Sequence, residues 1–175
     1  MLNFSKFMNP QEIFPIIMEN GVVIGRATRA ECHSGSLLLH PVVHLHLFNP
    51  EKELYLQKRS MTKDIQPGKW DTSVGGHVDY GESIEEALIR ETREELGLTG
   101  ITPVTLYSYL FKSEREKEMV HTFCAVTTEA DITIDKSEID CGAFWSIQKI
   151  KANIGKGIFT PNFELEFSKL LLHLP

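Results

Sequence analysis

Residues 76–98 read GHVDYGESIEEALIRETREELGL, and this segment carries the most specific pattern in the chain. Ser83 followed three residues later by Glu86 forms a capping box, which predicts that a helix begins there. Glycines precede this helix, and they predict tight turns at Gly75-Gly76 and at Gly81. The segment is therefore predicted to form a loop followed by a helix.

Three glutamates of this helix are predicted to lie side by side. Glu91, Glu94 and Glu95 stand at i, i+3 and i+4, which a helix places on one face. Like charges at this spacing repel, at a cost of about a few tenths of a kcal/mol per pair. Carboxylates suit hard divalent cations such as Mg²⁺ or Mn²⁺, so the cluster indicates either a metal site or a solvated acidic face. The buried stripe is predicted beside them, at Ile84, Ala87, Leu88, Thr92 and Leu96.

The full spacing resembles the Nudix box. Gly76 is followed by five residues and Glu82, then by seven residues and Arg90-Glu91, and then by Glu94-Glu95 and Gly97. Every polar and glycine position of the pattern is matched, and only Thr92 stands where a bulky aliphatic residue is more usual. A match at this many fixed positions is a strong signal. The resemblance implies a pyrophosphohydrolase, and it implies an α/β (α+β) fold, the Nudix-type α/β/α sandwich with a mixed β-sheet between helices.

The resemblance also implies a role for each residue of the box. Glu94 and Glu95 would bind a Mg²⁺ or Mn²⁺ cofactor, and Glu91 would be either a metal ligand or the general base. The carbonyl of Gly75 commonly completes the coordination in this family. Arg90 would orient a box glutamate through a charge-assisted hydrogen bond. Structural roles are expected for Gly76, Glu82 and Gly97.

A second resemblance is carried by the segment LYLQKRSMTKDIQPGKWDTSVGGHVDYGES, residues 54–83; it covers about residues 30–163 and is weak outside 40–98. It is similar to the Nudix branch that contains isopentenyl diphosphate isomerase. In the isomerases the residues equivalent to Arg59 and Lys63 contact the diphosphate. Five further equivalents build a metal site there: His33, His40, His77, Glu116 and Glu118.

Taken by themselves, these residues leave other interpretations open. Arg59 and Lys63 also fit a solvated loop, and His33 and His40 also fit hydrogen-bonded histidines of the core. Glu116 and Glu118 stand in the segment SEREKE, whose composition predicts the charged tip of a hairpin.

Two departures favour a hydrolase over an isomerase. Gly75 stands where the isomerases carry an essential Cys, and neither Trp70 nor Trp145 aligns with their essential Trp. In addition, Glu91 and Glu94 are acids that the isomerases usually lack. The predicted function is metal-dependent cleavage of a diphosphate linked to an organic group X, such as a nucleoside diphosphate derivative. The alternatives are an isomerase-like enzyme and a catalytically silent module that binds a diphosphate.

Composition agrees with a single domain spanning residues 1–175. The chain has 175 residues, 42% of them hydrophobic and 24% charged, and a net charge of −6. The excess of acid argues against partners such as nucleic acid or an anionic membrane and leaves a small-molecule diphosphate as the expected partner. The three cysteines show no disulfide or zinc pattern, and no signal peptide or membrane span is predicted, so a cytoplasmic protein is expected. Many relatives are dimers, which makes a homodimer one expectation.

Alternation of apolar and polar residues predicts the remaining elements. Residues 1–36 are expected to form an N-terminal hairpin extension, with strands at 12–18 and 22–27. Further strands are predicted at 40–48, 53–58, 103–111, 119–127 and 141–147, and a helix at 161–173. His44 and His46 share one strand face. A face that lines a substrate cleft and a face covered by a helix both fit this pattern, and we expect the helix. Four aromatic residues are candidates to stack on group X or to pack in the core: Trp70, Tyr80, Phe111 and Phe159.

Overall fold

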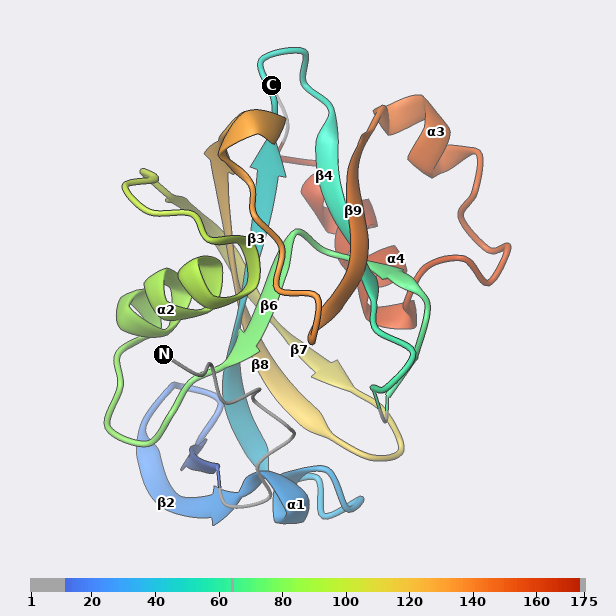
Figure 1. Cartoon of the computed structure of the whole chain (residues 1–175). Coiled ribbons are helices and arrows are strands. Elements are labelled where there is room, and N and C mark those ends of the chain that lie inside the picture. The colour runs from blue at the N-terminus through green and yellow to red at the C-terminus, as the bar shows by residue number, and fades with distance from the viewer. Residues whose placement is uncertain (1–11, 64, 174–175) are drawn as a thin grey trace.

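The computed structural model of the chain describes residues 12–63 and 65–173, and its centre is a mixed β-sheet (Figure 1). The central strands β3 (Leu39–Phe48) and β8 (Lys117–Val126) pair in parallel along ten residues each. The strand order is β5-β4-β3-β8-β7, with β6 paired to β3 and β9 paired to β4. The other strands are β4 (Leu54–Arg59), β5 (Trp70–Asp71), β6 (Val74–His77), β7 (Val104–Lys112) and β9 (Ile139–Trp145).

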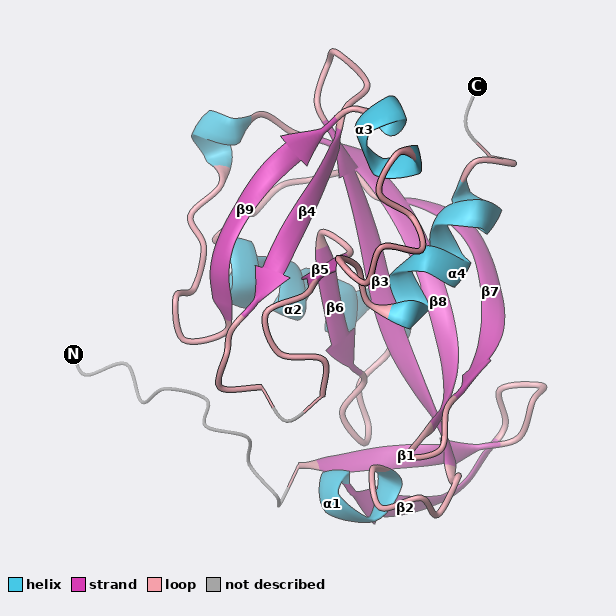
Figure 2. Cartoon of the chain, turned by 90° about the vertical axis from the view of Figure 1, so that its right-hand side faces the viewer, coloured by secondary structure: helices cyan, strands magenta, loops and turns pink. Residues whose placement is uncertain are grey.

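Helices cover both faces of this sheet, as Figure 2 shows for α2 (Ile84–Leu96) behind it and α4 (Pro161–Leu170) in front. Between α2 and the sheet lies a core built from alternate residues of β3 and from the helix stripe, including Val43, Leu45, Leu88 and Leu96. A second core packs α4 against β4 and β9 through Leu56, Trp145, Phe163 and Phe167. This arrangement is the predicted α/β/α sandwich with a mixed sheet.

The N-terminal part confirms the expected hairpin over the residues that the structure describes. β1 (Ile13–Ile17) and β2 (Val23–Thr28) pair antiparallel, and the short helix α1 (Arg29–Cys32) follows. The hairpin and α1 lie across one end of the sheet (Figure 2). Residues 1–11 of the predicted extension fall outside the described residues.

Helix α2 begins and ends where the sequence predicts. The Ser83 side chain accepts a hydrogen bond from the backbone of Glu86, whose carboxylate accepts one from the backbone of Ser83. Gly97 closes the helix in the left-handed conformation, with φ of 64°.

The predicted strands from 40–48 to 141–147 are confirmed to within two residues at each end, and α4 ends at Leu170, three residues before its predicted limit. Sequence analysis missed β5, β6, α1, the 3₁₀ helix η1 (Glu129–Asp131) and α3 (Ile147–Lys151), all of them short. Among the described residues, no helix has the length and apolar character needed to cross a membrane.

Candidate active site and its metal-binding groups

A cleft of about 650 Å³ opens beside β6, between the carboxylate-bearing face of α2 and the loops that follow β4 and precede β9. The structure brings together here the three box glutamates, Gly75, Gly76, His77, Arg59 and Lys63. Within the described part of the chain, none of the four aromatic candidates for stacking lines this cleft. Phe159 is buried in the core against Trp145, and the ring of Trp70 packs on the same tryptophan.

The two box glycines lie in a strand, so the turn predicted at Gly75-Gly76 is wrong. Both residues belong to β6, where Gly76 pairs with Val43 and Gly75 pairs with His44. A Cβ atom added at Gly76 would lie 2.1 Å from Cδ of Glu91. Glycine is required at 76 because the Glu91 side chain crosses directly over its backbone, a contact that the sequence alone does not reveal.

Helix α2 presents the three glutamates to the cleft with unequal exposure. Glu91 and Glu95 are 7% and 8% exposed, whereas the Glu94 side chain is 38% exposed. Oε2 of Glu95 accepts hydrogen bonds from Nε2 of Gln57 at 3.1 Å and from the backbone N–H of Gly75 at 3.3 Å. Burial and the nearby charge of Glu91 raise the pKa of Glu95 to about 8. Two buried carboxylates therefore stand close together at the base of the cleft.

Arg90 lies in the middle of α2 and connects residues of the loop before the helix to Glu91. Its Nε and Nη2 atoms each donate to the Glu82 carboxylate at 2.8 Å, and Nη1 donates to Oε1 of Glu91 at 2.6 Å. Nη2 also donates to the backbone carbonyl of His77 at 2.9 Å. Arg90 thus fixes the position of Glu91, and Glu82 fixes Arg90. Gly97 stands at the other end of the helix and terminates it.

Basic side chains line the cleft opposite the glutamates. Arg59 contacts Asp71 at 3.4 Å and donates to the carbonyl of Ile65, while Lys63 forms an ion pair with Glu138. Several residues of the cleft lining were not predicted from the sequence, among them Arg29 and Glu138. Neither belongs to a recognisable motif, and both reach the cleft only because the N-terminal segment and the loop before β9 fold against it.

Three histidines and two glutamates from distant segments meet next to the cleft. One of the histidines, His77, also lines the cleft. One ligand atom from each of His33, His40, His77 and Glu118 lies within 4.8 Å of the others. Glu116 approaches His33 to 3.5 Å. Burial and the charge of Glu116 raise the pKa of Glu118 to about 8.

The predicted hairpin tip is confirmed, since residues 113–116 connect the antiparallel strands β7 and β8, but the carboxylates of Glu116 and Glu118 are not exposed there. Both residues are buried, at 8% and 7% exposure, because the first residues of β8 and Glu116 just before it lie under the N-terminal hairpin. Phe14 of that hairpin stacks on the His77 ring at 4.3 Å between centroids. Nε2 of His40 is buried and has no hydrogen-bond partner in the described part of the chain.

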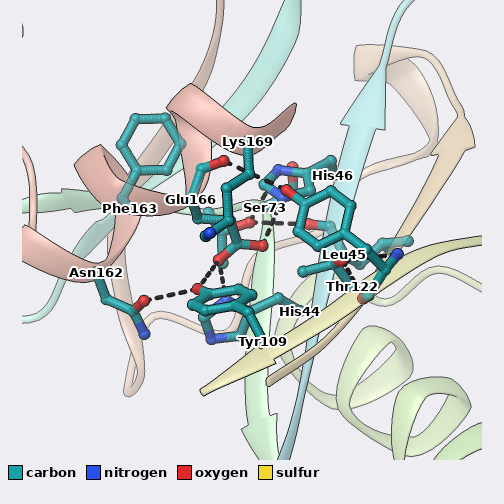
Figure 3. A network of polar contacts seen from close by, with 12 residues as sticks. His44, Leu45, His46, Ser73, Tyr109, Thr122, Asn162, Phe163, Glu166 and Lys169 are labelled. Atoms are coloured by element: carbon teal, nitrogen blue, oxygen red, sulfur yellow. Dashed lines mark hydrogen bonds and ion pairs between the residues drawn. The ribbon is translucent and has the colours of Figure 1, made fainter. Parts of the chain in front are cut away.

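His44 and His46 of β3 form a buried network under α4, which confirms that a helix covers them (Figure 3). Glu166 of α4 is completely buried, and its carboxylate lies 2.5 Å from Nδ1 of His44 and 2.7 Å from Nε2 of His46. The hydroxyl of Tyr109 lies 2.8 Å from the same carboxylate. Burial alone would lower the pKa of His44, but the charge of Glu166 and its hydrogen bond outweigh burial and raise the pKa to about 9. Burial likewise opposes ionisation of Glu166, yet the two histidines hold its pKa well below the usual range.

A second hollow, of about 690 Å³, lies at the other end of the sheet beside residues 97–102. Asp131 is the one carboxylate among its described lining residues, and exposed Val104 and Val126 form part of its wall. It carries none of the clustered charges that distinguish the cleft beside β6.

Comparisons with known proteins agree with the resemblance that the sequence motifs indicate. The family model described as the NUDIX domain matches residues 38–163. An uncharacterised Nudix hydrolase of Streptomyces coelicolor is 28% identical over 160 residues, which cover 91% of this chain and 88% of that protein. An isopentenyl-diphosphate delta-isomerase of Escherichia coli is 33% identical over 130 residues, 71% of each chain. The crystal structure of a Deinococcus radiodurans protein, 24% identical, matches with a TM-score of 0.78 and covers 90% of this chain and 98% of that one.

Proposed function

The chain belongs to the Nudix superfamily, in the branch similar to isopentenyl diphosphate isomerase, and from this premise we propose that it is a Mg²⁺- or Mn²⁺-dependent hydrolase of organic diphosphates. The proposed substrate is a diphosphate linked to a group X, as in nucleoside diphosphate derivatives. The proposed reaction is cleavage of that diphosphate linkage by water.

The observation that carries this proposal is the burial of Glu91 and Glu95 at the base of a cleft with Glu94 at its rim. A buried carboxylate is costly unless a cation or a proton neutralises it. The raised pKa of Glu95 expresses that cost. A divalent cation bound by oxygen ligands would relieve it, so the residues present fit the proposed cofactor.

Gly75 is proposed as a backbone ligand of the same cation. Its N–H donates to Glu95 and therefore points away from β3. In an antiparallel pair the N–H and C=O of one residue point to the same side, so the Gly75 carbonyl also faces the cleft. Glycine at 75 and the glutamates of α2 thus supply oxygen atoms from two directions.

The proposed roles of the side chains follow from their contacts. A bound cation would neutralise phosphate oxygens and make the attacking water more acidic. Glu91, held by Arg90, would act as a ligand or as the base that accepts the proton of that water. Arg59 and Lys63, together with Arg29, would attract the negative charge of the diphosphate from the opposite wall.

We also propose that His33, His40, His77 and Glu118 bind a second cation, with Glu116 beside them. Imidazole and carboxylate donors together suit Mn²⁺, Zn²⁺ or Fe²⁺ better than Mg²⁺. Nε2 of His40 is buried without a hydrogen-bond partner among the described residues and lies 3.9 Å from the Glu118 carboxylate; a cation bound by both groups would satisfy that nitrogen, which supports this assignment.

Metal analysis by mass spectrometry tests the second site. Protein purified without chelators is expected to retain roughly one transition-metal ion per chain, and His40→Gln is expected to lose it. His121→Gln, at a histidine outside the cluster, is the control. Equal metal content in all three proteins would show that the cluster holds no ion.

The histidine cluster is also the observation that favours an isomerase-like enzyme as a second candidate. That candidate lacks a thiol where the isomerases carry one, because residue 75 is glycine. An isomerase would exchange deuterium into isopentenyl diphosphate without releasing phosphate.

A panel of nucleoside, sugar and prenyl diphosphates, assayed with Mg²⁺ or Mn²⁺, separates the candidates. A hydrolase is expected to release the products of diphosphate cleavage from at least one compound, and addition of a chelator is expected to abolish the reaction. Deuterium exchange without phosphate release would instead identify an isomerase. Binding of a diphosphate without turnover would identify a silent binding module.

A further inference from the structure

Strand β4 carries a polar side chain on the face that it turns toward α2. Leu54 and Leu56 belong to the core beneath α4, whereas Tyr55 belongs to the core beneath α2. Because side chains of a strand alternate between its two faces, Gln57 lies on the same face as Tyr55. Gln57 is 5% exposed and lines the cleft. A buried amide is costly unless it is hydrogen-bonded, so its partner indicates its role.

The partner of Gln57 is a carboxylate of the Nudix box. Its Nε2 atom donates to Oε2 of Glu95 at 3.1 Å, and this is the one hydrogen bond of the Gln57 side chain within the described part of the chain. The N–H of Gly75 donates to the same oxygen at 3.3 Å. Strands β4 and β6 do not pair with each other. Oε2 of Glu95 therefore receives one donor from each of two separate strands.

These two donors leave the other oxygen of Glu95 for a cation. Each oxygen of an ionised carboxylate offers about two lone pairs. Both lone pairs of Oε2 are occupied by the N–H groups of Gln57 and Gly75. Oε1 accepts no hydrogen bond from the described residues, and Glu95 lines the cleft. The arrangement thus favours a cation bound to Oε1 alone.

The same arrangement requires an amide at residue 57. A carboxylate that binds a cation is ionised, so it only accepts hydrogen bonds and must face the NH₂ group of Gln57. A hydrocarbon side chain would leave one lone pair of Oε2 without a donor. A second carboxylate at this position would repel Glu95.

We propose that Gln57 is a positioning residue of the active site, which together with the N–H of Gly75 holds Oε2 of Glu95 so that the cation binds through Oε1 only. Gln57 acts through Glu95 and does not touch the reacting atoms. This inference rests on the proposed function, since it assumes that Glu95 binds a cation.

The affinity of the α2 carboxylates for Mn²⁺, measured by electron paramagnetic resonance without diphosphate, tests this role. Because the histidine cluster is a competing site, every protein in the titration carries His40→Gln. Gln57→Met keeps a side chain of similar length without a donor, and Gln57→Asn keeps the amide but withdraws it by one methylene group. Both are expected to weaken Mn²⁺ binding by about tenfold to a hundredfold, the range for partners of metal ligands.

Gln148→Met is the matched control, because it makes the same change at an exposed glutamine of α3 outside the cleft. It is expected to bind Mn²⁺ as the His40→Gln protein does. Thermal unfolding curves establish that each variant is folded at the temperature of the titration. A glutamine with a structural role alone would change these curves and leave the Mn²⁺ affinity of the folded protein unchanged. Gln57→Asn decides the question if Gln57→Met fails to fold.

Unchanged Mn²⁺ affinity in a folded Gln57 variant would overturn the inference, and so would an ion bound to Oε2 of Glu95 in Mn²⁺-soaked crystals. Either result leaves the proposed function intact if the unsubstituted protein hydrolyses a diphosphate of the panel. Absence of Mn²⁺ binding by the His40→Gln protein would overturn the inference and the proposed cation together. Conversely, if binding weakens as expected but no compound is hydrolysed, the proposed function fails while the role of Gln57 stands.

Discussion

Glu95→Gln is expected to reduce turnover of a hydrolysed substrate by about a thousandfold, since loss of a cation ligand removes several kcal/mol of charge stabilisation. The same substitution is expected to leave the free energy of unfolding unchanged or to increase it. The reason is that Glu95 is a buried acid whose raised pKa reports an unfavourable environment for its charge. The amide oxygen of Gln can still accept the hydrogen bonds from Gln57 and Gly75.

Glu85→Gln provides the matched control, because Glu85 is an exposed acid of the same helix and lies outside the cleft. The kcat of both variants with Mg²⁺ and their urea denaturation curves are the measurements. Wild-type turnover by Glu95→Gln would contradict the role assigned to this carboxylate. If Glu95→Gln lost turnover together with a lower free energy of unfolding, the proposed unfavourable environment of the buried Glu95 carboxylate would be contradicted.

Gly76→Ala is expected to reduce kcat/KM by about a hundredfold and to destabilise the fold by about 1–3 kcal/mol. The added Cβ would lie 2.1 Å from Cδ and 2.3 Å from Cγ of Glu91, so the glutamate side chain must move. Movement of Glu91 breaks its 2.6 Å hydrogen bond with Arg90. The φ angle of Gly76 lies outside the left-handed range, so the effect comes from packing alone.

A double substitution distinguishes this clash from a general effect on β6. In Gly76→Ala/Glu91→Ala the obstructing side chain is gone, so the destabilisation should be smaller than the sum of the single effects. Gly25→Ala is the control, because a Cβ atom at that glycine of β2 meets nothing within 4 Å. Additive effects in the double variant would mean that Glu91 does not define the space above Gly76.

The sequence predicted the helical part of the site because local rules control it. The capping box at Ser83 and the left-handed Gly97 set both ends of α2, and the spacing of Glu91, Glu94 and Glu95 then follows from helix geometry. The strand β6 was missed for a related reason. Glycine in a sequence normally indicates a turn. Gly76 instead leaves room for the Glu91 side chain, which reaches the strand only because α2 packs against it.

Other parts of the site combine residues from distant segments. The sequence indicates these parts less clearly, because only the tertiary structure brings the residues together. Glu116 and Glu118 stand in a charged segment, and nothing local indicates that β8 carries them to three histidines. Glu166 lies in an amphipathic helix and gives no sign of its role by itself. The paired His44 and His46 predicted a covering helix, and a polar partner on that helix is what their hydrogen-bonding capacity requires.

We propose that the α2 carboxylates bind a divalent cation in the cleft beside β6. Diffraction from crystals soaked in Mn²⁺, recorded at a wavelength where manganese scatters anomalously, measures this directly. We expect an anomalous peak within coordination distance of the carboxylates of Glu91 and Glu95, and we expect this peak to be absent in Glu95→Gln. Full Mn²⁺ occupancy elsewhere in the crystal, with no peak beside these two carboxylates, would contradict it.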